Sequence, residues 1–367
     1  MTTVASLPPS GTAPDAPRPA SGPRAPRAVA WLLGLHRPAL WAWAAIVVLL
    51  TGAILVLWGP LGEAAVAARP ELTMPDCGPG EVCGARVDFK PDQYYDEVYA
   101  WTNLAMIAVP FLVAAWAGAA LVGRELESGT ARLAWTLGIS PTRWLTAKLA
   151  VPAALITAGL TLLVLLHRGL WSDRHGRVGS ADDWWNGPTL YTNGPALPAF
   201  ALAALAVGAL AGVVCRRTLP ALGLGLGVTL ALGLATDRVL PYLWPRVTRV
   251  RALDEPYTYI DGIPVVRGLI TESGARIADP GCGPSWQDPQ CVALFDRVDV
   301  TGFYDTFHPQ SHFWPLHLMA AALLLAVAAA CVVTAYALIR RSTATPPRRH
   351  EAPAVSGSPT APIPTAT

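Results

Sequence analysis

Charged residues are scarce in this chain. Of its 367 residues, 14% are Asp, Glu, Lys or Arg and 53% are hydrophobic, and the mean hydropathy is +0.39. Soluble globular proteins carry about 25% charged residues, so this composition argues against a soluble enzyme and favours a polytopic membrane protein. A net charge of +2 without a basic, aromatic-rich tract also gives no reason to expect nucleic acid as a partner.

Several motifs of catalytic chemistry are missing as well. A phosphate-binding loop needs Gly-Lys-Ser/Thr, yet Lys90 follows Phe89 and Lys148 follows Ala147, and these are the chain's two lysines. Neither the HExxH nor the GxSxG motif occurs. We therefore expect no nucleotide site of the phosphate-loop type, no catalytic residue, no metal and no cofactor in this chain.

Long apolar runs without formal charge are the main feature that is present. About 20 helical residues cross the hydrocarbon core of a bilayer, and a soluble core helix would need a polar face. The sequence predicts an all-α polytopic membrane protein with six transmembrane helices. These spans cover about residues 40–58, 100–122, 149–166, 196–215, 219–236 and 313–339.

The basic residues predict the orientation of these spans. With both termini in the cytoplasm, the inner segments are residues 1–39, 123–148, 216–218 and 340–367, and they hold 14 basic and 4 acidic residues. The pairs Arg216–Arg217 and Arg340–Arg341 lie directly at span ends, where basic residues mark the cytoplasmic side. The long extracytoplasmic loops are then residues 59–99 and 237–312.

Four of the six cysteines fall in these outer loops, as two close pairs. Cys77 and Cys83 lie in the first loop, and Cys282 and Cys291 lie in the third. An oxidising exterior would allow each pair to form a disulfide. A zinc site at Cys77 and Cys83 is the alternative, but nearby histidines and the usual ligand spacing are lacking.

The two ends of the chain are rich in Pro, Ala, Ser and Thr. We expect residues 1–39 to be a disordered cytoplasmic tail with a short amphipathic lead-in near Trp31–His36, and residues 340–367 to be a second disordered tail. Residues 40–339 form the six-span domain. Ala65-Val66-Ala67 resembles a signal-peptide cleavage site, but so long a leader favours a retained anchor.

Few polar residues lie in the predicted spans, and each allows a structural reading beside a functional one. His317 inside the last span, with His308 and His312 just before it, suits an external metal or proton site, or an interfacial belt of polar rings. Gly208-x3-Gly212 and Gly223-x3-Gly227 suit packing inside one subunit, or a dimer face. The absence of acidic and basic residues inside the spans argues against an ion-driven carrier.

The first inner loop is the most informative segment. It predicts a short charged helix, a Ser-Gly-Thr break, a second amphipathic turn and a proline turn back into the membrane. Amphipathicity alone would also suit a lipid-facing interfacial helix. Its distinctive residues are Arg124, Glu125, Glu127, Gly129, Thr130, Arg132, Trp135, Arg143, Trp144 and Lys148.

The pattern Arg-Glu-x-Glu-x-Gly-Thr, followed by Ser-Pro-x-Arg-Trp and Lys, resembles the inner loop between the second and third spans of type-2 ATP-binding-cassette (ABC) permeases. It is most similar to the bacterial branch that moves antibiotics or lipids outward. The resemblance in topology covers the whole chain, whereas the specific motif covers residues 123–148. The long, cysteine-bearing outer loops depart from the common pattern.

The resemblance implies a function and partners. The chain would be a permease subunit in a bacterial plasma membrane, exporting a small molecule, drug or lipid. A separate ABC ATPase subunit would dock on the loop of residues 123–148, with Arg143 and Lys148 at the re-entry into the third span. The residues at the ATPase contact would be Glu125, Glu127, Gly129, Thr130 and Arg132. A second permease half, identical or similar, would complete the path. The rivals are a non-transporting membrane scaffold or sensor with disulfide-stapled outer loops, and a membrane enzyme acting on lipid.

Overall fold

The computed structural model describes residues 37–68, 90–178, 183–253, 255, 260–279 and 289–344. The chain divides into two units, residues 1–46 and 47–367. Residues 37–46 of the first unit form the beginning of helix α2 (Arg37–Trp58). Apart from the bounds of the first helical stretch, everything below concerns the second unit.

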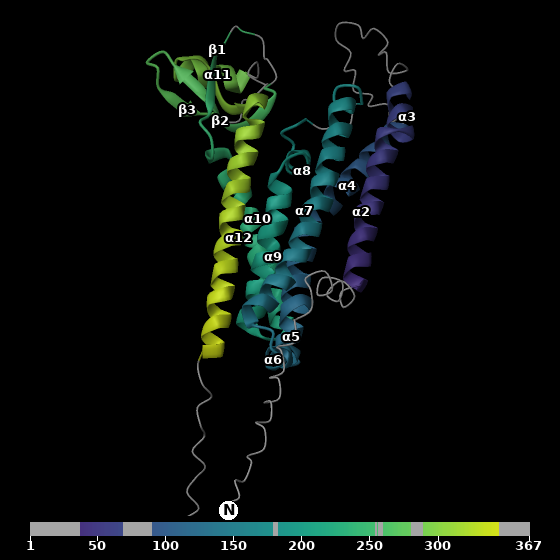
Figure 1. Cartoon of the computed structure of the whole chain (residues 1–367). Coiled ribbons are helices and arrows are strands. Elements are labelled where there is room, and N and C mark those ends of the chain that lie inside the picture. Colours follow the sequence, from purple (N-terminus) through teal and green to yellow (C-terminus); the bar gives the residue numbers. More distant parts are fainter. Residues whose placement is uncertain are drawn as a thin grey trace, which may run out of the picture. The chain divides into compact units, whose positions relative to one another are not determined.

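Helices make up most of the second unit (Figure 1). After α2 they are α3 (Pro60–Ala68), α4 (Lys90–Trp116), the π-helix η2 (Ala117–Gly123), α5 (Arg124–Glu127), α6 (Thr130–Thr136), α7 (Pro141–Arg174), α8 (Gly187–Thr192), α9 (Ala196–Cys215), α10 (Thr218–Val239), the 3₁₀ turn η3 (Leu240–Tyr242), α11 (Pro289–Arg297), the 3₁₀ turn η5 (Gln310–His312) and α12 (Phe313–Ala344).

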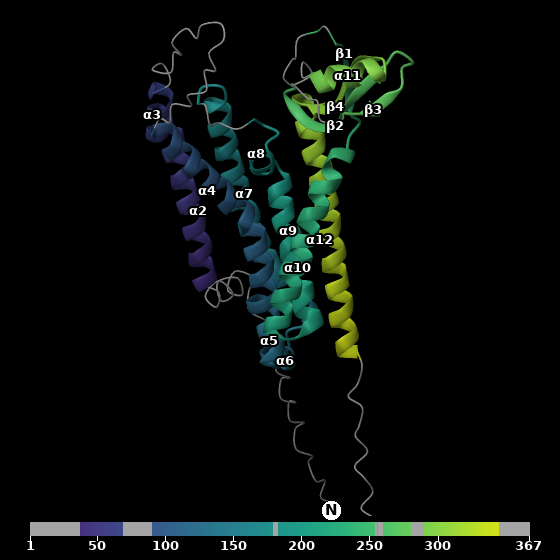
Figure 2. The ribbon, with the colours of Figure 1, turned by 180° about the vertical axis from the view of Figure 1, so that it is seen from behind.

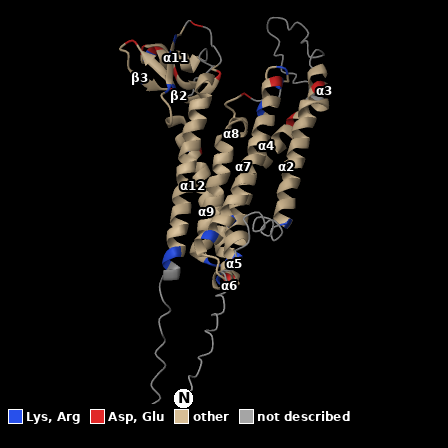
Figure 3. Ribbon diagram, in the orientation of Figure 1, with Lys and Arg blue, Asp and Glu red and all other residues tan. Residues whose placement is uncertain are grey.

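Six helical stretches among the described residues are long and apolar enough to cross a membrane, as the sequence predicts. They are Arg37–Ala68, Gln93–Glu127, Pro141–Arg174, Ala196–Cys215, Thr218–Tyr242 and Gln310–Arg341. Residues 37–39 and 340–344, which the sequence analysis assigned to the tails, are helical. In Figure 3, Lys and Arg gather near α5 and α6 and at the end of α12, whereas the central turns of α9 and α12 carry no charge.

Helix α9 is the centre of the helical part. It packs against α4, η2, α7, α10 and α12. The helix is apolar on every side, and most of its residues are buried, as such a composition predicts. Ala199 and Ala203 of α9 meet Ala321 and Leu324 of α12. Small side chains let helix backbones approach closely, which provides packing where lipid removes the hydrophobic drive.

A four-stranded antiparallel sheet lies between α10 and α12 in sequence. Its strands are β1 (Val247–Ala252), β2 (Gly262–Thr271), β3 (Arg276–Ala278) and β4 (Val300–Pro309), in the order β1-β4-β2-β3. Figures 1 and 2 show it beyond the ends of α10 and α12, at the end away from α5 and α6. The all-α prediction therefore holds for the spans but not for this segment, which was expected to be a long loop.

The sheet has its own small core and a buried charge cluster. Leu269, Phe295, Val300 and Phe303 pack together, which fixes α11 against the sheet. Asp305 of β4, 3% exposed, pairs with two arginines of neighbouring strands, Arg267 at 2.7 Å and Arg251 at 3.4 Å. A buried carboxylate needs such partners because an unpaired charge is costly to bury.

Candidate functional site

Residues 123–148, which we call the coupling segment, run from the end of η2 through α5 and α6 into α7. Gly129 separates α5 from α6 with a left-handed backbone conformation (φ 77°), which glycine adopts without steric cost. Ser140 then caps α7, because its hydroxyl accepts a hydrogen bond from the Arg143 backbone N–H at 3.3 Å, and Pro141 follows at the first helical position. The helix–break–helix–proline order predicted from the sequence is the order observed.

Glu125 ties α5 to the third span. Its carboxylate accepts a hydrogen bond from the indole Nε1 of Trp144 at 3.0 Å and forms an ion pair with the Nζ of Lys148. Lys148 is 3% exposed, so the carboxylate compensates a buried cation. The ring of Trp135 also meets that of Trp144 edge to face, with 5.9 Å between centroids, which holds α6 against α7.

Glu127 ties the same short helix to the fifth span. Its Oε2 accepts hydrogen bonds from the backbone N–H of Thr218 at 2.8 Å and from the Thr218 hydroxyl at 2.5 Å. Thr218 begins α10, where the first N–H groups have no partner within the helix. Glu127 therefore caps a helix that begins 91 residues away along the chain. The partial positive charge at the helix N-terminus also attracts the Glu127 carboxylate.

The π-helix η2 joins this anchor to the centre of the bundle. A Cβ at Gly118 would lie 2.8 Å from the carbonyl oxygen of Ala221 in α10 and 3.2 Å from that of Gly208 in α9. A Cβ at Gly208 would lie 2.3 Å from the carbonyl oxygen of Ala114 in α4. The backbones of the second, fourth and fifth spans thus come into close contact next to the coupling segment. Only glycine fits at positions 118 and 208.

The outer face of the coupling segment is exposed. Leu133, Leu137 and Ile139 are 62%, 76% and 40% exposed. The predicted site residues fall into three classes: Arg124, Glu127, Thr130, Arg132 and Arg143 are exposed, Glu125, Gly129 and Trp135 are half-buried, and Trp144 and Lys148 are buried. An apolar ridge flanked by arginines is the kind of surface on which a protein partner docks.

The comparison with protein families gives a match to this part of the chain. The model described as "ABC-2 membrane transporter related" covers residues 44–240, more than half of the chain, including the coupling segment and the second to fifth spans. The chain belongs to the ABC-2 membrane transporter related family. No curated protein and no solved structure matches it.

Membership in the ABC-2 family accounts for several features at once. Permeases of this kind are generally non-catalytic membrane subunits, and the family implies a membrane setting and an ATPase partner. The match ends at residue 240, before the sheet begins at Val247. The sheet of this ABC-2 protein therefore lies outside the part that the family shares.

A buried polar layer, which the sequence analysis did not find, lies at the other end of the helices. Asn103 of α4 accepts a hydrogen bond from the Thr192 hydroxyl at 2.7 Å, and His167 of α7 donates from Nδ1 to Asn193 Oδ1 at 2.7 Å. Tyr99 and Thr189 share a hydrogen bond of 2.9 Å. These bonds fix the segment from α8 to α9 against α4 and α7. His167 was not among the polar residues considered inside the spans, because the predicted span ended at residue 166, whereas α7 continues to Arg174.

The three histidines that could have formed a metal or proton site do not come together as a set. The Nδ1 atoms of His308 and His312 lie 3.1 Å apart, and the Nε2 atom of His308 forms a hydrogen bond of 2.9 Å with the carbonyl oxygen of Pro241. His317 instead packs on the ring of Phe313 and is fully buried. Among the residues that the structure describes, no group of three or more His, Cys, Asp or Glu is suited to hold a metal.

The disulfide predictions fall mostly outside the described residues. Cys77, Cys83 and Cys282 lie there, as does the lead-in near residues 31–36. Cys291 is in α11, half-buried against the core of the sheet. Both disulfide pairs stay predictions.

Proposed function

We propose that this chain is the permease subunit of a bacterial ABC exporter that moves a small molecule, drug or lipid out of the cell, powered by a separate ATPase that docks on the coupling segment. The family match supports the permease role. The α5–α6 end would face the cytoplasm and the sheet the exterior, because basic residues gather at the α5–α6 end and at the end of α12.

The single observation that carries the coupling role is the pair of anchors made by α5. Glu125 holds α7 through Lys148, and Glu127 holds α10 through Thr218. A push on the exposed ridge of Leu133 and Leu137 would therefore reach two spans at once. Coupling between sites requires such a physical connection. A loop held by one span alone would transmit the movement to that span only.

A proposed sequence of events follows from this connection. ATP binding would draw two ATPase subunits together, and each would shift the α5–α6 unit on which it is docked. That shift would tilt α7 and α10 and change the packing of η2 against α9. Packed interfaces tend to have discrete arrangements, so the outward path would open as one step.

A second permease half would complete the path, and the glycines of α10 support this. A Cβ at Gly223 or Gly227 would meet no atom of another described helix within 4 Å, unlike a Cβ at Gly208 or Gly212 of α9. Leu224 and Val228 beside them are 44% and 42% exposed. The α9 glycines thus serve packing inside the subunit, while the α10 pair leaves room for another helix.

The docking proposal is tested by purifying the tagged protein from native membranes in mild detergent, with mass spectrometry of the proteins retained. We expect a protein with a phosphate-binding loop to be retained in stoichiometric amount. Leu133→Asp with Leu137→Asp should abolish its retention, because an unpaired charge would be buried in the contact.

Val250→Asp is the matched control, since Val250 is 56% exposed in the sheet at the other end of the molecule. It should retain the ATPase at the level of the unmodified protein. Retention of no ATPase, or equal retention by the double variant, would favour the scaffold or sensor reading instead.

A further inference from the structure

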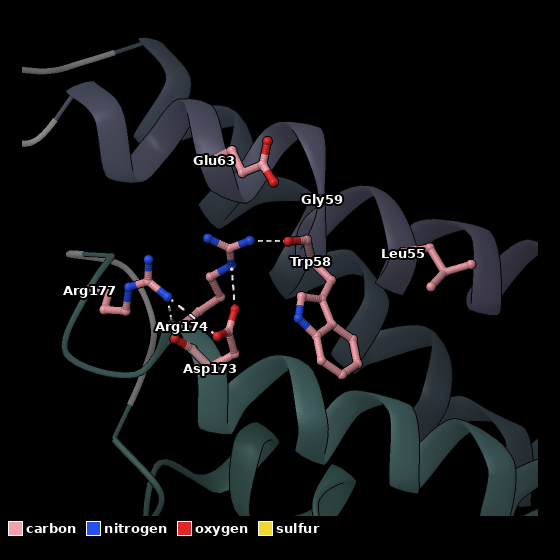
Figure 4. Close-up of a pocket in the computed structure, with 7 residues that line it drawn as sticks. All are labelled: Leu55, Trp58, Gly59, Glu63, Asp173, Arg174 and Arg177. Carbon is pink, nitrogen blue, oxygen red and sulfur yellow. Dashed lines mark hydrogen bonds and ion pairs between the residues drawn. The ribbon is translucent and has the colours of Figure 1, made fainter.

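A pocket of about 540 Å³ lies at the end of α7 away from the coupling segment, between α7 and the turn from α2 to α3. Figure 4 shows its lining: Leu55, Trp58, Gly59, Glu63, Asp173, Arg174 and Arg177. Its size is within the range of small-molecule sites. Neither the family match nor the coupling proposal assigns it a role.

The cationic side of the pocket is built and largely buried. Arg174 is 5% exposed. One of its Nη atoms donates to the backbone carbonyl of Trp58, and its Nε lies 3.3 Å from the Asp173 carboxylate without an acceptor in hydrogen-bonding geometry. Arg177, which is 55% exposed, lies 3.3 Å from the other oxygen of the same carboxylate. Two guanidinium groups therefore share one carboxylate, which leaves an excess of positive charge.

Two glycines make room for this arrangement. A Cβ at Gly62 would lie 2.9 Å from the Arg174 Nε, and a Cβ at Gly169 would lie 2.6 Å from the Trp58 ring. The guanidinium thus passes close to the backbone of α3, and the indole lies against the backbone of α7. These contacts hold both side chains in fixed positions at the pocket.

A carboxylate stands on the opposite side of the pocket. Glu63 of α3 is exposed, and it forms no ion pair with the described arginines. Toward the middle of α2 the lining is apolar, with Leu55 53% exposed. Val56, the next residue of α2, is 46% exposed. The pocket therefore offers a cationic side, a separate anionic side and an apolar exit along α2.

Its depth matches the lipid headgroups. Arg174 is the last residue of the third membrane-spanning helix, and Trp58 ends α2, within the first span. Tryptophan favours the membrane interface, and arginines near span ends reach toward headgroups. A ligand entering along Leu55 and Val56 would come from the bilayer itself.

We propose that this pocket binds the headgroup of an aminophospholipid, with the phosphate at Arg174 and Arg177, the primary ammonium at Glu63 and the acyl chains along Leu55 and Val56. Guanidinium groups bind phosphate through charge-assisted hydrogen bonds. A primary ammonium carries three donors that a carboxylate accepts, whereas the trimethylammonium of phosphatidylcholine carries none. The leaflet is the outer one if the proposed topology holds; the site itself does not depend on it.

The test is native mass spectrometry of the delipidated full-length protein with equal amounts of phosphatidylethanolamine, phosphatidylglycerol and phosphatidylcholine. We expect phosphatidylethanolamine to be retained about fivefold more than phosphatidylcholine, the upper range for one exposed ion pair. Glu63→Gln should remove that preference, and Arg177→Gln should lower retention of all three lipids. Both side chains are exposed, so these variants should fold.

Controls at exposed positions of the sheet, Glu272→Gln and Arg249→Gln, make the same charge changes and should leave retention unchanged. A soluble competitor, glycerophosphoethanolamine at equal concentration, should not displace the lipid, because it lacks acyl chains. Equal retention of the three lipids, a preference that survives Glu63→Gln, or displacement by the competitor would overturn the proposal. None of these outcomes bears on ATPase docking.

Discussion

At the residue scale, Glu125 is the most consequential side chain of the coupling segment. It accepts the Trp144 indole N–H and neutralises Lys148, which is almost completely buried. The sequence marked Glu125 as part of a motif for partner contact. In the fold its carboxylate faces another helix of the same chain, so its first role is to join α5 to α7.

Replacing Glu125 should therefore reduce stability before any partner is considered. We expect Glu125→Ala to cost roughly 2–3 kcal/mol, because the buried Lys148 would lose its ion pair with Glu125. Unfolding of the detergent-solubilised protein in a denaturant series would measure this cost. Glu125→Gln, which keeps an acceptor for the Trp144 N–H, should cost less.

Arg132→Ala is the matched control for this prediction, since Arg132 is exposed in the same segment. Surface changes of this kind usually stay within about 0.5 kcal/mol. A Glu125→Ala variant as stable as Arg132→Ala would show that the ion pair with Lys148 adds nothing to the fold.

The local structure of the coupling segment can be predicted from the sequence, but the partners of its residues cannot. The Ser-Gly-Thr break and the proline turn are local signals, and both are present in the structure. Thr218, the partner of Glu127, lies 91 residues away, and the contact exists only because η2 and α10 pack together. The lipid pocket was missed for a similar reason: Arg174 lies beyond the charge-free run that ended at residue 166, yet α7 continues to it.

At the scale of elements, glycines divide the helices into packed and open faces. A Cβ at Gly208 or Gly212 would lie within 3.0 Å of α4 or η2 atoms, whereas Gly223 and Gly227 face open space. The same four-residue spacing thus has two structural meanings, and only the fold separates them.

Alanine substitutions should show this division directly. We expect Gly208→Ala to destabilise the protein by about 1–3 kcal/mol through overpacking. Gly223→Ala should be neutral or stabilising by up to about 1 kcal/mol, because glycine is a poor helix former. The two variants can be compared by thermal unfolding in the same detergent, and equal losses would contradict the packing described here.

The α10 glycines also test the second permease half. Gly223→Leu with Gly227→Leu should leave the monomer folded but lower the dimer fraction in size-exclusion chromatography with light scattering. An unchanged dimer fraction would remove the support that α10 gives to a dimer face.

The sheet, unlike the helices, could not be predicted from the sequence. Six helices could be predicted because about 20 apolar residues in a row are a strong signal. β1 and β3 are short, and burial along the longer β2 and β4 does not alternate regularly; β4 is buried at four successive positions. Its charge cluster is non-local as well, since Asp305 pairs with arginines on two different strands.

At the scale of the whole molecule, the chain combines the helices of the family-matched residues 44–240 with a sheet and a last helix, α12, that lie beyond the match. The coupling segment lies at one end of the helices, and the buried polar layer and the lipid pocket lie toward the other. Movement imposed at α5 would reach the far end through α7, a single helix from Pro141 to Arg174. The proposed export cycle depends on that continuous connection.

The most direct measurement is photo-cross-linking in living cells from a reactive side chain placed at Leu137, the most exposed apolar residue of the coupling segment. We expect an adduct with one soluble protein that carries a phosphate-binding loop, and no such adduct from the same probe at Val250 in the sheet. Cross-linking at Leu137 that captures no ATPase, or the same adduct from both positions, would contradict the claim that this segment couples the permease to ATP hydrolysis.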